Sequence, residues 1–325
     1  MKKNVAIIMG GYSTEYDISI KSGSVVYQYL DRNSYNPYKV IIAKEAWYVL
    51  LDNGQKVEID KGDFSAFIHG EKIKFEVVFN AIHGTPGEDG YMQAYLEMLG
   101  IPQTACDFYQ AALTFNKRDL LSVLKAYGIR SAESVYLNEG DPIDADAILA
   151  KVGLPCFVKA NRAGSSMGTS KIYKKEELDQ ALANAFAEDD QVLIEAFLDG
   201  TEVSVGVITY KGKTKVLPIT EIVPHGDWFD YKAKYEGGST EYTPARIPQE
   251  MTDKISALAQ KAYEVLGMKG FSRSEFIIVD GNPFMLEMNT TPGLTEQSLL
   301  PQQAAEAGIP LAELFDNALT EALKK

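Results

Sequence analysis

The first hundred residues alternate short apolar runs with helical patterns, and this alternation constrains the fold more than any other feature of the chain. The apolar runs cover residues 5–9, 38–43 and 76–81, and the helical patterns cover residues 18–30 and 91–99. Buried strands that alternate with helices are typical of an open parallel sheet with helices on its faces. We therefore predict a Rossmann-like, open parallel α/β domain, which ends where glycine and proline stop the last helix at 100–102.

The remaining chain divides into two further α/β segments. The second is predicted to hold two helices and three strands, at residues 109–127, 176–187, 133–137, 156–160 and 192–196. The third is predicted to hold two strands, an irregular piece, a helix, a hairpin and a last helix, at residues 201–209, 214–218, 224–248, 249–266, 271–288 and 311–323. An irregular piece of that length is usually a functional lid or disordered. We predict domains over residues 1–102, 103–198 and 199–325, with a lid at 224–248.

Charge and composition limit the partners of the chain. The formal net charge of −13 over 325 residues argues against a nucleic-acid partner, whose phosphates require a basic surface. No apolar stretch approaches the roughly 20 residues of a membrane span, and the apolar run after the first lysines is too short for a secretory signal. The two cysteines are too few for a disulfide framework. We expect a cytoplasmic protein with no membrane partner and no nucleic-acid partner.

The first strand runs into the sequence MGGYSTE, which ends at Glu15. A glycine turn between a strand and a helix is where nucleotide-binding folds hold a phosphate. Glu15 argues against that interpretation, because a carboxylate repels a phosphate beside it. The string also lacks the GxGxxG spacing of dinucleotide-binding turns. The local pattern therefore leaves open which ligand this turn faces.

The strongest site signal is the hairpin sequence FSRSEFIIVDGNPFMLEMN. Side chains alternate between faces along a strand, so Arg273 shares a face with Glu275, and Glu287 shares one with Asn289. A three-residue turn over Asp-Gly-Asn would set Glu275 directly opposite Glu287, whereas a two-residue turn would shift this register. Two opposed carboxylates need a cation between them, and oxygen ligands suit Mg²⁺. The alternative is a solvated sheet face with two unrelated glutamates.

Other charged residues are candidates for a nucleotide site. Lys159 closes the apolar strand PCFVK directly before the Gly/Ser-rich loop NRAGSSMGTS, where an ammonium and loop N–H groups suit a phosphate. Because no GxxxxGK[ST] string is present, a surface lysine beside a solvent loop is the alternative. Glu195 and Glu202 are candidates for binding adenine and ribose, or are surface acids. Lys117 lies in a predicted helix and is uninformative alone, and His83 in HGTPGEDG is a candidate proton carrier.

Six strings in collinear order resemble the ATP-grasp carboxylate–amine ligases, and more closely the D-alanine–D-alanine ligases. They are GGYSTEYDISIKSG, HGTPGEDGYMQ, the lysine of TFNK, VKANRAGSSMGTSK, FDYKAKY, and RSEF together with LEMNTTPGLTEQSLLP. The resemblance spans nearly the whole chain and implies a three-domain ATP-grasp fold, with ATP between the central and C-terminal domains. It also implies two D-alanine substrates, a homodimer and two Mg²⁺ ions, for which Mn²⁺ substitutes.

The resemblance implies a role for each charged residue of the nucleotide site. Lys117 and Lys159 would contact ATP phosphates, and Lys234 on the lid would reach the γ-phosphate. Glu195 and Glu202 would bind adenine and ribose.

For the metal site, the resemblance implies that Glu275, Glu287 and Asn289 hold the magnesium ions. Arg273 would steady the transferring phosphate and the developing oxyanion. The family usually has aspartate where this chain has Glu275, and the longer side chain still reaches Mg²⁺ but shifts the carboxylate.

For the amino acids, the resemblance implies that Glu15 binds the ammonium of the first D-alanine and hydrogen-bonds Ser165, which pairs with Tyr235 on the lid. The hydroxyl and backbone around Ser298 would receive the carboxylate of the second D-alanine. ATP would phosphorylate the first D-alanine, and the amine of the second would attack the acyl phosphate to give a dipeptide for peptidoglycan precursors. Acyl phosphates hydrolyse readily, so a lid that excludes water is needed.

Two alternatives differ in function. A D-alanine–D-lactate ligase of the same fold resembles this chain but carries histidine where Tyr235 stands. A protonated imidazole there would repel the ammonium form of D-alanine, so Tyr235 favours dipeptide formation. From a different class, a non-catalytic nucleotide-binding module is the other alternative, although every implied phosphate and metal position is filled.

Overall fold

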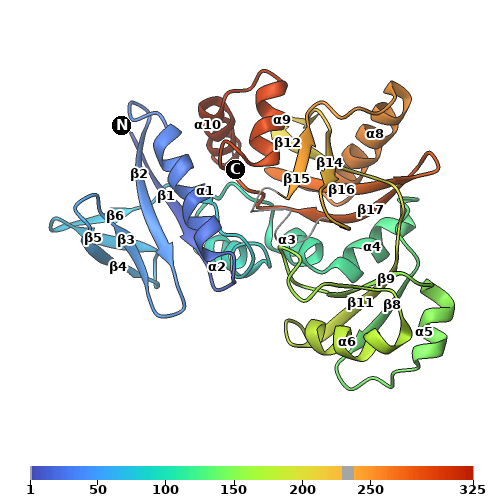
Figure 1. The fold of residues 1–325 in the computed structure, drawn as a ribbon. Helices are drawn as coiled ribbons and strands as arrows, with labels where there is room; N and C mark the ends of the chain where they lie inside the picture. Colours follow the sequence, from blue (N-terminus) through green and yellow to red (C-terminus); the bar gives the residue numbers. More distant parts are fainter. Residues whose placement is uncertain (1, 229–237, 325) are drawn as a thin grey trace.

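The computed structural model describes residues 2–228 and 238–324, which fold around three β-sheets (Figure 1). The N-terminal sheet (blue) lies at one end of the molecule. The central sheet (green) and the C-terminal sheet (yellow to red) lie at the other end, one below the other in this view. Each sheet is formed by one of the three segments that were predicted from the sequence as separate domains.

The N-terminal sheet has seven strands in the order β6-β5-β4-β3-β2-β1-β7. Its predicted parallel part and helices are present as β1 (Lys3–Gly10), α1 (Tyr16–Tyr29), β2 (Tyr35–Ile42), β7 (Val77–Asn80) and α2 (Tyr91–Met98). The sheet continues beyond β2 through antiparallel strands that were not predicted: β3 (Trp47–Leu50), β4 (Lys56–Asp60), β5 (Ser65–Ile68) and β6 (Glu71–Lys74). These strands are short and partly exposed, so their apolar pattern is weak.

Gly10 and Gly11 turn the chain from β1 towards α1. Their φ angles are +98° and +104°, a region that L side chains rarely adopt. A Cβ on Gly10 would lie 2.8 Å from the carbonyl oxygen of Ile42, and the Gly11 N–H donates to that same oxygen at 2.7 Å. The turn therefore presses against the end of β2 and delivers Glu15 to the N-terminus of α1.

The prediction of one helix over 109–127 is wrong. The chain forms two helices, α3 (Phe108–Phe115) and α4 (Lys117–Ala126), which are separated by Asn116. Asn116 has extended backbone angles, and its side chain accepts a hydrogen bond from the backbone N–H of Asp119, which caps α4. Lys117 is therefore the first residue of a helix rather than a residue in the middle of one.

The central sheet has the strand order β10-β9-β11-β8, with antiparallel neighbours. Its elements are β8 (Ser134–Asn138), α5 (Ala145–Val152), β9 (Cys156–Ala160), β10 (Ser170–Ile172), α6 (Leu178–Phe186) and β11 (Gln191–Ala196). The Gly/Ser-rich loop joins β9 to β10, and within it Ser165 and Ser166 have φ angles of +51° and +58°. Of these elements, α5 and β10 were not predicted.

The C-terminal sheet has the order β15-β14-β12-β16-β17, with β13 paired to β12. Its elements are β12 (Thr201–Tyr210), β13 (Lys213–Val216), β14 (Thr220–Pro224), β15 (Ser239–Tyr242), α8 (Gln249–Val265), β16 (Phe271–Val279), β17 (Asn282–Asn289), α9 (Leu299–Glu306) and α10 (Leu311–Ala322). The predicted irregular piece over 224–248 therefore contains a strand, β15, which pairs with β14.

The hairpin of β16 and β17 turns over two residues, Asp280 and Gly281, because Val279 pairs with Asn282. Both turn residues have positive φ angles, +46° and +72°, as tight hairpin turns with two central residues require. Of the two turn lengths considered from the sequence, the structure therefore has the two-residue turn.

A β-bulge in the same hairpin restores the predicted pairing of the charged residues. The register shifts between Glu275 and Phe276, so that Glu275 pairs with Glu287 and Arg273 pairs with Asn289. A bulge places one extra residue in one strand, which compensates for the shorter turn. The predicted pairing is confirmed, although a different turn produces it.

Two cores join segments that are distant in sequence. Met9 of β1 and Phe315 of α10 belong to one apolar cluster, and Figure 1 shows α10 beside α1. Leu120 of α4 and Phe276 of β16 belong to another. The helix α4 therefore packs against the C-terminal sheet, although it precedes the central sheet in sequence.

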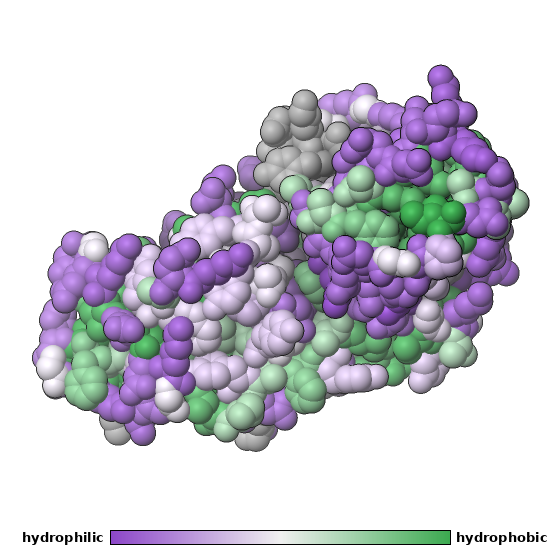
Figure 2. Space-filling model, turned by 90° about the horizontal axis from the view of Figure 1, so that it is seen from below, coloured by the Kyte–Doolittle hydropathy of each residue, from purple (hydrophilic) through white to green (hydrophobic). Residues whose placement is uncertain are grey.

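The surface seen from below mixes hydrophilic residues (purple) with smaller apolar patches (green), as Figure 2 shows. Among the described residues, none of the helices is both long enough and apolar enough to cross a membrane.

Candidate active site

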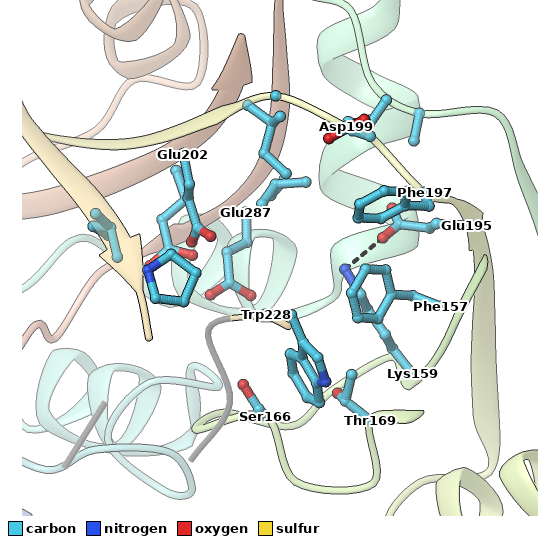
Figure 3. Close-up of a pocket in the computed structure, with 18 of the residues that line it drawn as sticks. Phe157, Lys159, Ser166, Thr169, Glu195, Phe197, Asp199, Glu202, Trp228 and Glu287 are labelled. Carbon is cyan, nitrogen blue, oxygen red and sulfur yellow. Dashed lines mark hydrogen bonds and ion pairs between the residues drawn. The ribbon is translucent and has the colours of Figure 1, made fainter. Parts of the chain in front are cut away.

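A cavity of about 380 Å³ lies between the central and C-terminal sheets, and we call it the nucleotide cavity. Figure 3 shows Phe157, Lys159 and Glu195 of the central sheet on one side of it. Glu202 of β12 and Glu287 of β17 lie on the other side. Cationic, anionic and aromatic side chains therefore meet in one cavity, which suits a ligand with both a flat apolar part and charged groups.

Lys159 and Glu195 form a buried ion pair in this cavity, with Lys159 Nζ 2.7 Å from Glu195 Oε2. Burial disfavours the ammonium, but the attraction of Glu195, helped by Glu287 and Glu202, outweighs it and raises the pKa of Lys159. Lys159 is therefore charged at neutral pH. The other oxygen, Glu195 Oε1, is buried and has no hydrogen-bond partner among the described residues, so it can accept a hydrogen bond from a ligand.

Lys117 reaches the nucleotide cavity from the first turn of α4. Its Nζ donates to the carbonyl oxygen of Ala163 in the Gly/Ser-rich loop at 2.7 Å and lies 3.2 Å from Glu287 Oε2. One ammonium thus connects this loop to the hairpin carboxylates.

The hairpin carboxylates lie directly opposite one another, as Glu275 pairs with Glu287 across β16 and β17. Arg273 donates from Nη1 to Glu275 Oε1, and also to Ser204 Oγ at 3.1 Å. The Arg273 guanidinium therefore supplies positive charge beside the carboxylates of Glu275 and Glu287. This charge offsets the repulsion between two like charges that lie opposite one another.

The donors on this hairpin fit Mg²⁺. Glu275, Glu287 and Asn289 offer oxygen ligands, which Mg²⁺ prefers. The buried Asn289 Nδ2 has no hydrogen-bond partner in the described part of the chain, so its N–H groups can donate to a substrate oxygen beside the ion. Over residues 2–228 and 238–324, no group of three or more His, Cys, Asp or Glu side chains is placed to hold a metal. A bound ion would therefore need further ligands from a substrate phosphate.

Glu15 accepts a hydrogen bond from Ser165 Oγ, across 150 residues of sequence. Gly164 allows this approach, because a Cβ at that position would lie 2.6 Å from Glu15 Oε2. Glu15 and Ser165 are therefore hydrogen-bonded to each other, as the resemblance implies.

A second cavity, of about 620 Å³, lies on the Glu15 side of the Gly/Ser-rich loop, and we call it the amino-acid cavity. Glu15, Arg273 and Ser298 line it. It shares Ser165 and Glu287 with the nucleotide cavity, so the two cavities meet at these side chains.

Ser298 occupies the N-cap position of α9, and its hydroxyl lies 2.8 Å from Thr295 Oγ1. The N–H groups of the first helical turn have no partners within the helix, and the helix dipole favours an anion there. Ser298 and the start of α9 therefore provide donors for a carboxylate in the amino-acid cavity.

Glu88 was not singled out from the sequence, and it holds the loop that follows β17. Its carboxylate accepts hydrogen bonds from the backbone N–H groups of Gly84 and Thr290, both at 3.1 Å, and of Thr291 at 3.4 Å. Burial, and next the negative charge of Glu15, raise the pKa of Glu88 to about 7. The glycine-rich string HGTPGEDG was the available signal for this residue.

His83 fixes the same loop from the other side. Its Nδ1 lies 2.7 Å from the carbonyl oxygen of Thr291, which can only accept, so Nδ1 carries a proton. Its Nε2 lies 3.0 Å from Ser22 Oγ. Burial lowers the pKa of His83, so the ring is neutral with both nitrogens engaged. These contacts support a role for the ring in holding the loop, and the candidate role in proton transfer stays a prediction.

Lys234 and Tyr235, the predicted lid residues, lie outside the described residues. The chain before them is described, and Trp228 lines the nucleotide cavity together with Phe157 and Phe197 (Figure 3). Phe157 and Phe197 were not singled out from the sequence, because an aromatic residue in or beside an apolar strand is usually a core residue.

These observations first define a class. Two sheets enclose one cavity lined by lysines and carboxylates, and a separate α/β sheet supplies Glu15 to a cavity beside it; this is the arrangement of an ATP-grasp ligase. Comparison with known proteins gives the family. The family models described as D-ala D-ala ligase N-terminus and C-terminus match residues 4–106 and 123–320. The chain belongs to the D-alanine–D-alanine ligase family.

Individual relatives agree with this assignment. A D-alanine–D-alanine ligase of Flavobacterium johnsoniae is 64% identical over 317 residues, which cover 98% of both chains. The structure of a D-alanine–D-alanine ligase of Bacillus anthracis complexed with ATP is 30% identical, with a TM-score of 0.79 over 100% of this chain and 98% of that one. A D-Ala:D-Ser ligase of Enterococcus faecalis is 29% identical, with a TM-score of 0.86 over 99% of this chain and 100% of that one. The predicted family and fold are confirmed.

Proposed function

We propose that the chain joins two molecules of D-alanine to D-alanyl-D-alanine at the expense of ATP, through a D-alanyl phosphate. One observation carries this proposal most strongly: the nucleotide cavity and the amino-acid cavity meet at Ser165 and Glu287. A phosphoryl group and a carboxylate bound on either side of this junction would lie close together. Proximity of this kind removes much of the entropic barrier to their reaction.

In the nucleotide cavity, we assign Lys117 and Lys159 to the phosphates of ATP. Glu195 is assigned to the adenine amino group, and this is supported by its buried Oε1, for which the described residues offer no hydrogen-bond partner. Glu202 is assigned to the ribose, and Lys234 to the γ-phosphate.

For the metal, we propose two Mg²⁺ ions, or Mn²⁺ in their place, held by Glu275, Glu287 and Asn289 with phosphate oxygens of ATP. Bound metal would supply positive charge to the transferring phosphoryl group. Arg273, between the hairpin and the amino-acid cavity, is assigned to the equatorial oxygens of that group.

In the amino-acid cavity, we assign Glu15 to the ammonium of the first D-alanine, with Ser165 and Tyr235 completing the contact. The N-terminus of α9 with Ser298 is assigned to the carboxylate of the second D-alanine. The first carboxylate attacks the γ-phosphorus and ADP leaves. The second amine then attacks the acyl carbon, and inorganic phosphate leaves.

The second substrate separates this proposal from its nearest alternatives. D-Alanine–D-lactate ligases share the fold, and the Enterococcus faecalis relative is a D-Ala:D-Ser ligase. We propose D-alanine, because Tyr235 stands where a histidine would repel an ammonium, and because the F. johnsoniae relative is a D-alanine–D-alanine ligase.

We further propose that the chain acts as a cytoplasmic homodimer in peptidoglycan precursor synthesis. The division into domains at 1–102, 103–198 and 199–325 is likewise retained as a proposal. It is supported by one sheet in each segment, although α4 packs across to the C-terminal sheet.

The proposal is tested by D-alanine-dependent release of phosphate from ATP, with the product identified by mass. D-Lactate and D-serine are offered in competition at pH 7.5. Dipeptide as the main product is expected, and D-alanyl-D-lactate as the main product would overturn the proposed specificity.

A further inference from the structure

The segment that leaves β14 is tied to the central sheet at Asp227. The carboxylate lies 2.9 Å from Lys171 Nζ through Oδ1, and its Oδ2 accepts the hydroxyl of Tyr173. Lys171 lies on β10, an edge strand of the central sheet, and Tyr173 follows that strand. Asp227 therefore connects the two sheets that enclose the nucleotide cavity.

The environment of Lys171 makes this contact more than a surface ion pair. The Lys171 side chain is only 5% exposed, whereas that of Asp227 is 54% exposed. Its ammonium lies 3.9 Å from the centre of the Phe197 ring. Burial alone would lower the pKa of Lys171, but the bonds to Asp227 and Tyr173 outweigh burial and raise it. A buried ammonium depends on its anionic partner, because removal of that partner leaves the charge uncompensated.

The next residue of the same segment, Trp228, is held by aromatic contacts. Trp228 packs edge-on against Phe157, with ring centres 5.3 Å apart, and Phe157 packs against Phe197 at 6.2 Å. Figure 3 shows the three rings on the wall of the nucleotide cavity, near the Lys159–Glu195 pair. A polar contact at Asp227 and an aromatic contact at Trp228 thus seat adjacent residues on the same wall.

We propose that Asp227, Lys171 and Tyr173 form a latch that holds residues 224–228 against the central sheet and retains the nucleotide in its cavity. The three are positioning residues, because they support the cavity wall rather than the reacting atoms. Lys171 is the last residue of the string VKANRAGSSMGTSK. The resemblance implies no role for Lys171, Tyr173 or Asp227. The inference rests on the proposed use of this cavity for ATP. When the latch opens, Trp228 loses its support and nucleotide leaves faster, while the phosphate and metal residues stay in place.

The test compares Asp227→Asn with the wild type. The substitution keeps the size of the side chain and removes its charge. Isothermal titration with ADP and Mg²⁺ should show a dissociation constant about fivefold to tenfold higher, with a matching rise in KM for ATP and a change in kcat below about twofold. Asp146→Asn is the matched control, because it breaks an exposed ion pair with Lys175 and leaves the nucleotide cavity intact.

A second variant keeps the proposal falsifiable. Lys171→Met removes the ammonium and keeps its apolar stem, and the double variant with Asp227→Asn should bind ADP no more weakly than the weaker single variant. ADP affinity within twofold of the wild type in Asp227→Asn would overturn the latch, and so would a lower kcat at unchanged ADP affinity. ADP binding needs no D-alanine, so a wild type that binds ADP and makes no dipeptide would contradict the proposed function alone.

Discussion

The hairpin carboxylates and Glu15 reach the active site by two different routes. Glu275 and Glu287 lie on neighbouring strands joined by one tight turn, so local strand pairing sets their relative position. Glu15 meets Ser165 across 150 residues of sequence, so its position depends on how separate sheets pack. Local register therefore builds the candidate metal site, and tertiary packing builds the candidate site for the first D-alanine.

This difference separates the effects that substitutions should have. Under the proposed function, a change on the hairpin should act on phosphate transfer, whereas a change at Glu15 should act on the binding of D-alanine.

Glu287→Ala should have the largest effect, because Glu287 faces Glu275, pairs with Lys117 and lies where the two cavities meet. We expect kcat for ADP formation to fall by at least about 100-fold. D-Alanine-dependent phosphate release measures this loss. Glu250→Ala, on the exposed start of α8, is the control and should keep the wild-type rate. A nearly active Glu287→Ala enzyme would remove Glu287 from the metal site.

Glu88 should make stability depend on pH. Its pKa is raised from 4.5 to about 7, mainly by burial, so the folded state disfavours the charged carboxylate. The resulting penalty is absent below about pH 4.5, grows as pH rises, and is complete above about pH 7. Between pH 5 and pH 8 the wild type should lose about 2–3 kcal/mol of unfolding free energy relative to Glu88→Gln. Urea unfolding of both proteins measures this, and a difference that does not change with pH would contradict the assignment.

Glu15→Gln should weaken ligand binding in the amino-acid cavity and leave ligand binding in the nucleotide cavity unchanged. The amide can still accept from Ser165 but cannot neutralise an ammonium, so KM for the first D-alanine should rise about 10- to 100-fold. The dissociation constant of ADP, measured by titration, should stay within about twofold of the wild type. Equal losses for both ligands would mean that Glu15 supports the whole site rather than the amino-acid cavity.

Asn116→Ala should have the smallest effect, and it tests the unpredicted helix break. Loss of the cap on α4 should cost about 1 kcal/mol in urea unfolding. Asp144→Ala removes the equivalent cap from α5 and should cost a similar amount. Only Asn116→Ala should also raise KM for ATP, because the next residue, Lys117, enters the nucleotide cavity. Equal KM values in both variants would show that the cap does not position Lys117.

Part of the site could be predicted from the sequence because its geometry is local. Side-chain alternation places Arg273 and Glu275 on one face of β16, and Glu287 and Asn289 on one face of β17. It sets Glu275 opposite Glu287 only in one of the two registers that the turn allows. The turn length did not follow, because Asp-Gly and Asp-Gly-Asn are both reasonable turns. The bulge that corrects the register was also invisible, since Leu286 is apolar and fits either register.

Other parts depend on long-range contacts that no local pattern encodes. Glu88 accepts a hydrogen bond from Thr290, about two hundred residues away, and the glycine-rich string around Glu88 does not indicate this contact. The antiparallel strands after β2 are short, and β4 and β6 are largely exposed, so no clear alternation of apolar residues marks these two strands in the sequence. The break at Asn116 was missed because apolar residues continue in helical spacing on both sides of it. Lys171 was not singled out from the sequence, because its contact with Phe197 joins two segments that are separate in the chain.

One labelling experiment tests the central claim most directly. The enzyme is supplied with ATP, Mg²⁺ and D-alanine that carries ¹⁸O at both carboxylate positions. The masses of the released phosphate and of the dipeptide are then measured by mass spectrometry. Transfer through D-alanyl phosphate predicts that each released phosphate carries one ¹⁸O and that the dipeptide retains the other three. Unlabelled phosphate, or label without dipeptide, would contradict the account.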